Sequence, residues 1–496
     1  MVKIKKSTGV TRTEELLATL CERVFLKLWC YSNPYKDDHN GKEMCDLLAV
    51  FDNHVFVFFD REMQLFNKLD DLSSDEDWKI QWGRWKREVV DKQIRTAYGA
   101  ENYLKSGREI FLDKDRKTPF PIDIDRSNMI VHKIIVAHGA DKACKHYLKG
   151  KLTGSLPIIY ALPKAKSSTP FVVKLDQEKP VHILDSYNLK IILSELDTVV
   201  DLAAYLEAKV EAIHYYKALR YYGEEDMLAH YFLNYNEKQK RYRVYTDQSE
   251  IEGAEIPEGK WLEFRESKKY QWRKDANEIS YLWDAFIQRT CQNALDDILI
   301  GKNILLGKSA VYEMAKESRT ARRHFAESIN ESILKFPENG WDMKRRFILS
   351  PNRKTGYVFL QIKRNKSVDY EKAYRPECLN LLEISCGALR NRCNHIENVV
   401  GIGIEPPKFS TETHEDFILM ECAEWSNELR EKYEDANKKY GFFRSGDIIH
   451  SRSYDFPDNP NETVQRRMLT MQRRKPRRND ACPCGSGKKF KRCCMS

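Results

Sequence analysis

Apolar residues recur at helical spacing near the start of the chain. Leucine and valine side chains repeat every three or four positions between Leu16 and Leu28, which predicts an amphipathic helix over residues 11–31. Asn33-Pro34 is expected to end this helix, because the residue before a proline avoids the helical conformation.

Two apolar runs rich in β-forming residues follow this helix. They cover residues 45–51 and 54–59, and Asp52-Asn53 between them is typical of a two-residue hairpin turn. A second helical pattern covers residues 82–104. The N-terminal region is therefore predicted as helix, strand, strand, helix.

The rest of the chain mixes short strands with helices. The predicted strands are residues 157–161, 171–173, 182–184, 357–362 and 399–404. The predicted helices are 191–221, 223–231, 375–392 and 415–439, with a mostly helical, charged stretch over 268–346. On one of these helices Arg319, Arg322, Arg323 and His324 favour a basic, solvated face. The fold class is α+β with several domains.

The patterns divide the chain into five segments. The expected segments are an N-terminal domain at 1–145, a mixed α/β to helical middle domain at 146–345, a small α/β domain at 346–457, a basic linker at 458–480 and a C-terminal knuckle at 481–496.

Composition supports a folded protein and leaves nucleic-acid binding open. The chain has 496 residues, of which 42% are hydrophobic and 11% aromatic, which argues against disorder. A net charge of +9 permits binding to DNA or RNA without requiring it. No apolar run approaches the length of a membrane span, and the N-terminus lacks the apolar region of a signal peptide. We therefore expect a cytoplasmic protein that makes no use of a membrane.

Four cysteines gather in the last fifteen residues. Cys482 and Cys484 precede a Gly-Ser-Gly turn, and Cys493 and Cys494 follow it. Four thiolates at this spacing predict a tetrahedral zinc site, and the alternative of disulfides requires an oxidising compartment. Because four protein ligands leave no position for water, this zinc is expected to be structural.

This stretch resembles the SEC-C zinc motif found at the C-terminus of the SecA translocation ATPase and in many other bacterial proteins. The resemblance implies zinc binding by the four cysteines, and it implies docking to a protein partner such as a chaperone or the ribosome. The whole chain is similar to uncharacterised bacterial SEC-C proteins that look like accessory or antiviral (phage-defence) proteins.

Carboxylates flank the predicted hairpin. Asp46 opens its first strand, and Asp60 and Glu62 close its second strand on one face. Antiparallel pairing would bring the three together as hard oxygen ligands suited to Mg²⁺ or Mn²⁺. Such a metal would support hydrolysis of a phosphodiester.

Residues 11–110 resemble the PD-(D/E)xK nuclease superfamily in this order of elements and in the placing of the carboxylates. In that resemblance Asp46 is the first carboxylate and Asp60-Arg61-Glu62 the second element, with Glu62 where lysine is usual. The resemblance implies that Lys92, on the next helix, takes the role of a migrated lysine that contacts phosphate.

Two functions remain open on these observations. The first is a zinc-binding protein with a Mg²⁺-dependent, or degenerate, endonuclease-like domain that acts on DNA or RNA. The second is a non-enzymatic adaptor in which the zinc knuckle docks a chaperone, the ribosome or a complex subunit.

Overall fold

The computed structural model describes most of the chain as two compact units. It describes residues 6–38, 41–63, 74–149, 155–162, 169–246, 252–295, 303–339, 342–410, 415–442, 455–456, 489 and 492. One unit lies within Val2–Ser267 and the other within Lys268–Ser496.

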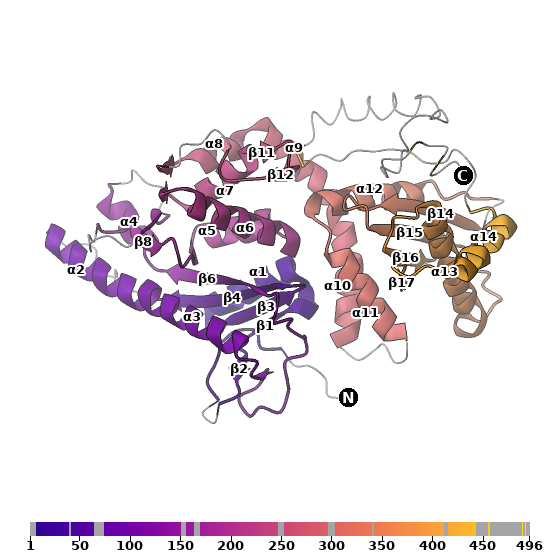
Figure 1. The fold of residues 1–496 in the computed structure, drawn as a ribbon, viewed down its shortest axis with the longest axis horizontal. Helices are drawn as coiled ribbons and strands as arrows, with labels where there is room; N and C mark the ends of the chain where they lie inside the picture. Colours follow the sequence, from indigo (N-terminus) through magenta and orange to yellow (C-terminus); the bar gives the residue numbers. More distant parts are fainter. Residues whose placement is uncertain are drawn as a thin grey trace. The chain divides into compact units, whose positions relative to one another are not determined.

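The N-terminal unit combines a main sheet with smaller sheets and helices (Figure 1). Its elements in chain order are α1 (Arg12–Trp29), β1 (Cys30–Ser32), β2 (Tyr35–Lys36), β3 (Leu47–Phe51), β4 (His54–Glu62), α2 (Asp75–Trp85), the π-helix η2 (Lys86–Asp91), α3 (Lys92–Lys105), β5 (Ile110–Phe111), β6 (Ile130–His138), α4 (Asp141–Tyr147), β7 (Ile158–Ala161), β8 (Val173–Asp176), β9 (His182–Asp185), α5 (Asn188–Glu195), α6 (Val199–Tyr215), β10 (Ala218–Tyr221), α7 (Glu224–Leu233), β11 (Tyr235–Asn236), β12 (Arg241–Tyr242), β13 (Ala254–Ile256) and α8 (Lys260–Glu266).

The main sheet has five strands in the order β1-β3-β4-β6-β9. Strand β3 is antiparallel to both of its neighbours, whereas β6 runs parallel to β4 and to β9. The predicted hairpin is present, and Asp52 in its turn has a φ of 54°, a left-handed conformation that aspartate tolerates better than most residues. The carboxyl ends of the parallel strands β4, β6 and β9 therefore meet at one edge.

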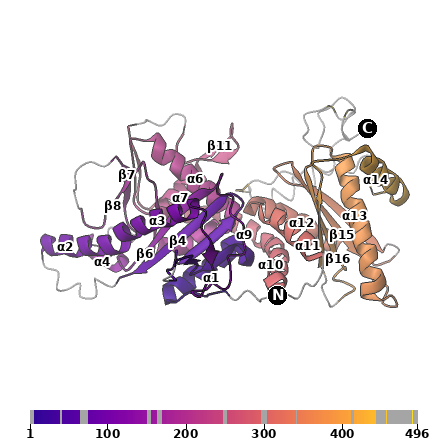
Figure 2. The same ribbon diagram turned by 60° about the horizontal axis from the view of Figure 1, so that its bottom comes forward.

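Helices cover both faces of this sheet. Phe25 of α1 packs on Phe56 of β4, with ring centroids 4.7 Å apart. Lys133 of β6 points to the opposite face, where it pairs with Glu101 of α3 at 2.7 Å. Helices α2, η2 and α3 follow one another as a long helical segment along that second face (Figures 1 and 2). This arrangement suits parallel strands, which need both faces buried.

The helix predicted at 191–221 is wrong in its extent. The structure divides it into α5, α6 and the strand β10. The side chain of Thr198 accepts a hydrogen bond from the amide of Asp201 at 3.1 Å, which starts α6 afresh. Strand β10 belongs to a four-stranded sheet of order β13-β10-β7-β8, and two further sheets pair β11 with β12 and β2 with β5.

The C-terminal unit places helices on both sides of a four-stranded sheet. Its elements are α9 (Lys268–Asn277), the 3₁₀ helix η3 (Glu278–Ser280), α10 (Tyr281–Leu295), α11 (Asn303–Ala315), α12 (Arg319–Leu334), β14 (Met343–Leu349), β15 (Thr355–Ile362), the π-helix η4 (Tyr370–Tyr374), α13 (Arg375–Arg392), β16 (Asn398–Ile404), β17 (Glu415–Glu421) and α14 (Asn427–Tyr440).

Neighbouring residues of β15 show which helices cover which face of the C-terminal sheet. Tyr357 contacts the rings of Trp283 on α10 and Phe325 on α12. Val358 points the other way into a core formed with residues of α13, among them Leu382. The sheet order is β14-β15-β16-β17, with β15 and β16 parallel.

Two expectations for this unit are wrong. Residues 415–421 form strand β17 rather than the start of a helix, because they pair in antiparallel register with β16 and complete the sheet. The arginines of α12 are buried rather than solvated: Arg319 and Arg322 each lie 2.8 Å from a carboxylate oxygen of Asp284. An ion pair with hydrogen bonds makes such burial tolerable.

The basic linker and the zinc motif lie almost wholly outside the described residues. The four cysteines of the zinc motif, Cys482, Cys484, Cys493 and Cys494, all lie outside the described residues. Within the described part of the chain, no helix is long and apolar enough to cross a membrane.

Gly387 generates a prediction about packing. A Cβ atom at this position of α13 would lie 2.2 Å from the ring of Tyr433 on α14. Gly387→Ala should therefore destabilise the protein by about 1–3 kcal/mol through overpacking. The matched control is Gly99→Ala on α3, where nothing lies within 4 Å, and it should stabilise by about 0.5–1 kcal/mol. Urea and thermal unfolding measure both changes, and equal effects of the two substitutions would contradict this account.

Candidate functional site

Asp46 and Asp60 lie against each other at the end of the β3–β4 hairpin. The amide of Asp46 donates to the carbonyl of Phe58 at 3.0 Å. The amide of Asp60 donates to Oδ2 of Asp46 at 2.6 Å. The antiparallel register thus places these two residues together, as the hairpin pattern implied.

The carboxyl group of Asp46 is held in a half-buried, acidic environment. Burial raises its pKa to about 7, while the hydrogen bond from the Asp60 amide acts in the opposite direction. The carboxylates of Glu43, Glu14 and Asp60 raise the pKa further. Near neutral pH this carboxyl group is therefore divided between its protonated and ionised forms.

The side chain of Asp60 is paired with a histidine from the next strand. Its Oδ2 atom lies 3.1 Å from Nε2 of His138, and both side chains are buried. The carbonyl of His138 accepts a hydrogen bond from the indole of Trp85 at 3.2 Å, which holds the end of β6 in place. No local motif in the sequence marks His138, because 78 residues separate it from Asp60.

The same histidine contacts a serine beyond the third parallel strand. Nδ1 of His138 lies 2.9 Å from Oγ of Ser186, which is partly exposed in the turn between β9 and α5. A chain of hydrogen bonds therefore crosses the ends of β4, β6 and β9 through Asp60, His138 and Ser186. Sheets with parallel strands commonly place their sites at this edge.

Further buried acids surround this edge. The carboxylate of Asp185 accepts hydrogen bonds from the amides of Leu156, Tyr187 and Asn188 at 2.9–3.0 Å. Burial raises the pKa of Asp185, and burial together with the charge of Asp185 raises the pKa of Glu225. Perturbed carboxyl groups gathered at one edge are typical of functional sites.

Glu62 and Lys92, the other two predicted site residues, are both exposed. Glu62 is exposed at the last position of β4. Lys92 is exposed at the start of α3 and forms an ion pair with Glu88 one turn earlier.

The donor set does not form a complete Mg²⁺ site as the structure places it. One oxygen of Asp46 accepts the Asp60 amide, and Asp60 is bonded to His138. Within the described residues, no group of three or more histidine, cysteine, aspartate or glutamate side chains is arranged to hold a metal.

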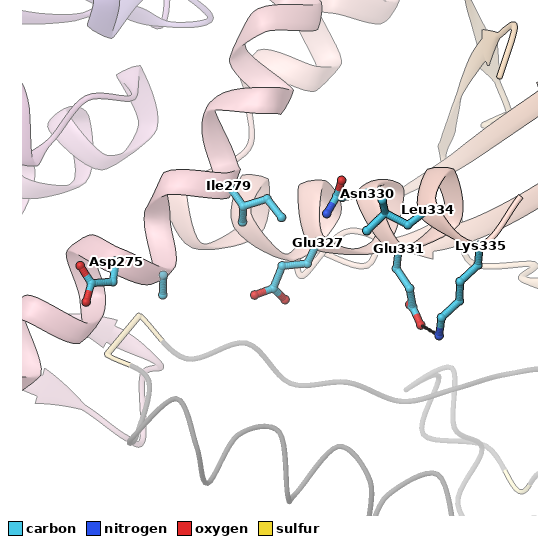
Figure 3. A pocket seen from close by; sticks show the side chains of 8 residues that line it. Asp275, Ile279, Glu327, Asn330, Glu331, Leu334 and Lys335 are labelled. Atoms are coloured by element: carbon cyan, nitrogen blue, oxygen red, sulfur yellow. Dashed lines mark hydrogen bonds and ion pairs between the residues drawn. The ribbon is translucent and has the colours of Figure 1, made fainter. Parts of the chain in front are cut away.

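A surface pocket in the C-terminal unit is a weaker candidate. Its volume is about 430 Å³, and its lining includes Asp275, Ile279, Glu327, Glu331 and Lys335 (Figure 3). The ion pair between Glu331 and Lys335, 2.7 Å long, lies along its wall and lowers the pKa of Glu331. Neither a nucleophile with a base nor a buried carboxyl group marks this lining.

Comparison with known proteins identifies the C-terminal segment. Residues 478–496 match the family model of the SEC-C motif, which is associated with zinc binding. The chain is also similar to a UPF0225 protein of Vibrio parahaemolyticus, with 28% identity over 130 residues that cover 24% of this chain and 77% of that relative. No solved structure matches the chain.

The raised pKa of Asp46 predicts how Asp46→Asn changes stability with pH. A protein loses stability as the pH rises from 4 to 7 when one of its aspartates ionises near pH 4 in the unfolded state and near pH 7 in the folded state. The asparagine variant should therefore gain stability relative to wild type from pH 4 to pH 7, by at most about 1.4 kcal/mol per pKa unit, and then level off. Urea unfolding at several pH values measures this. The prediction would be contradicted if the difference in stability between Asp46→Asn and wild type did not change with pH and equalled that of the exposed control Asp115→Asn.

Proposed function

We propose that this protein binds one structural zinc ion through Cys482, Cys484, Cys493 and Cys494. The match of residues 478–496 to the SEC-C motif supports this proposal, because that segment contains all four cysteines. Segments this short need a metal or a partner to hold a shape. Four thiolates fill a tetrahedral shell, so this zinc would shape the segment and take no part in a reaction.

Zinc content tests this proposal. Purified full-length protein should retain about one zinc per chain after dialysis, measured by mass spectrometry of the metal. Cys493→Ser and Cys482→Ser should each lower the content close to zero, whereas Cys378→Ala, at a buried cysteine of α13, should keep it. Full zinc content in both serine variants would exclude this set of ligands.

We further propose that the N-terminal unit is nuclease-like and acts on nucleic acid at the edge where Asp46 and Asp60 meet. Apart from β2, which belongs to another sheet, the elements follow the order α1, β1, β3, β4, α2–α3. This order supports the proposal, since it repeats the helix, strands and helix of the PD-(D/E)xK resemblance. The contact between Asp46 and Asp60 supports it as well. Glu62 in place of lysine and the lack of a three-ligand group among the described residues favour a degenerate form.

The alternative is an adaptor without catalysis. The occupied oxygens of Asp46 and Asp60 favour this function, because carboxylates that already bond to protein groups are less available to a metal. In such a protein the zinc segment would dock a protein partner, and the sheet would serve as a scaffold.

A cleavage assay separates the two functions. Supercoiled plasmid and end-labelled RNA are incubated with the full chain and Mg²⁺ or Mn²⁺, beside Asp46→Ala. If the N-terminal unit is an active nuclease, loss of this carboxylate should lower the rate by roughly 100-fold or more. The control Asp115→Ala, at an exposed position, should cleave at the wild-type rate.

Lack of cleavage with either metal would rule out the active nuclease. The adaptor would then predict capture of a protein partner that is lost in Cys482→Ser and kept in Asp46→Ala.

A further inference from the structure

Ser186 occupies a turn between a strand and a helix. It follows the last residue of β9 and precedes α5, which begins at Asn188. Its side chain is partly exposed, whereas His138 behind it is buried. The serine is therefore partly accessible from solvent, and the imidazole lies beneath it.

The hydrogen bonds fix the direction of proton transfer. An ionised carboxylate can only accept a hydrogen bond, so beside Asp60 the neutral form of the His138 ring carries its proton on Nε2. Nδ1 then presents its lone pair to the hydroxyl group of Ser186 at 2.9 Å. A nucleophile bonded to a base, with the base oriented by a third group, is the usual arrangement for covalent catalysis.

We propose that Ser186, His138 and Asp60 form a metal-independent hydrolytic centre that cleaves carboxylic esters or thioesters. Ser186 is the nucleophile, His138 the general base and Asp60 the residue that orients the base. This inference goes beyond the proposed function, since it needs neither zinc nor a second metal.

Charge selects the class of substrate. The carboxyl groups of Asp46, Asp185 and Glu225 gather at the same sheet edge as the serine, and two of them influence each other electrostatically. In their ionised forms these carboxyl groups repel the anionic backbone of a nucleic acid unless a cation offsets their charge. A neutral acyl group is not repelled by these carboxyl groups.

The reaction balances without a further reactant except water. Oγ of Ser186 adds to the carbonyl carbon while its proton passes to Nδ1 of His138. The tetrahedral intermediate expels the alcohol or thiol, which leaves with that proton. Water then attacks the acyl-serine with the same base, which releases the carboxylic acid and restores Ser186.

A fluorophosphonate probe tests this centre directly, because it phosphonylates activated serines. The folded full chain is treated with the probe in the presence of EDTA, and the adduct is located by mass spectrometry of peptides. We expect one adduct at Ser186 that is absent from Ser186→Ala and strongly reduced in His138→Ala. The control Ser127→Ala, at an exposed serine bonded to Asp125, should be labelled like wild type.

Hydrolysis of p-nitrophenyl butyrate provides the second measurement. Ser186→Ala should lower kcat/KM on the order of 1000-fold, and Asp60→Asn should lower it as well while the serine stays in place. Circular dichroism confirms that each variant is folded.

Absence of the adduct in folded wild type, or an adduct elsewhere, would overturn the proposal. Nuclease activity is read in a separate assay that requires Mg²⁺ or Mn²⁺ and depends on Asp46, so failure of one proposal is distinct from failure of the other.

Discussion

The parallel pairing of β4 with β6 is the contact on which the N-terminal unit depends. It runs without interruption from His54 opposite Ile130 to Glu62 opposite His138. Both faces of a parallel ladder must be covered, and α1 and α3 cover them, so the main core and the sheet form together. Because parallel strands end at one edge, the same pairing delivers Asp60 and His138 to one place although they are far apart in the chain.

Burial of polar groups at that edge has a cost that hydrogen bonds offset. A buried carboxylate without partners costs several kcal/mol. Here Asp46 and Asp185 accept hydrogen bonds from backbone amides, and Asp60 is bonded to the imidazole of His138. The C-terminal unit solves the same problem with charge, since Asp284 pairs with two buried arginines of α12. The ion pairs of Asp284 hold two helices of the C-terminal unit together. The hydrogen bonds at the edge of the N-terminal sheet instead keep His138 in contact with the partly exposed hydroxyl group of Ser186.

Sequence reasoning succeeded where the signal was local. The hairpin at Asp52-Asn53, the helix over 375–392 and the cysteine motif depend on neighbouring residues, so periodicity and spacing were enough. It failed where tertiary contacts decide. Residues 415–421 are a strand because β16 pairs with them. Arg319 and Arg322 of α12 are buried because they pair with Asp284, which is 35 and 38 positions away from them in the sequence. For the site, the pattern placed Asp46 beside Asp60, but His138 and Ser186 come from other strands and carry no mark of their own.

Charge decides what chemistry this edge can support. A phosphodiester is anionic, so it needs a cation beside these carboxylates when they are ionised. Within the described residues, no group of three or more histidine, cysteine, aspartate or glutamate side chains is arranged to hold one. An ester is neutral, and its reaction needs only a nucleophile and a base, which Ser186 and His138 supply within 2.9 Å. The zinc proposed for the C-terminal cysteines cannot substitute for that cation, because four thiolates complete its shell. Any hydrolysis by this chain at its N-terminal sheet therefore either recruits a cation to Asp46 or proceeds through the serine without one.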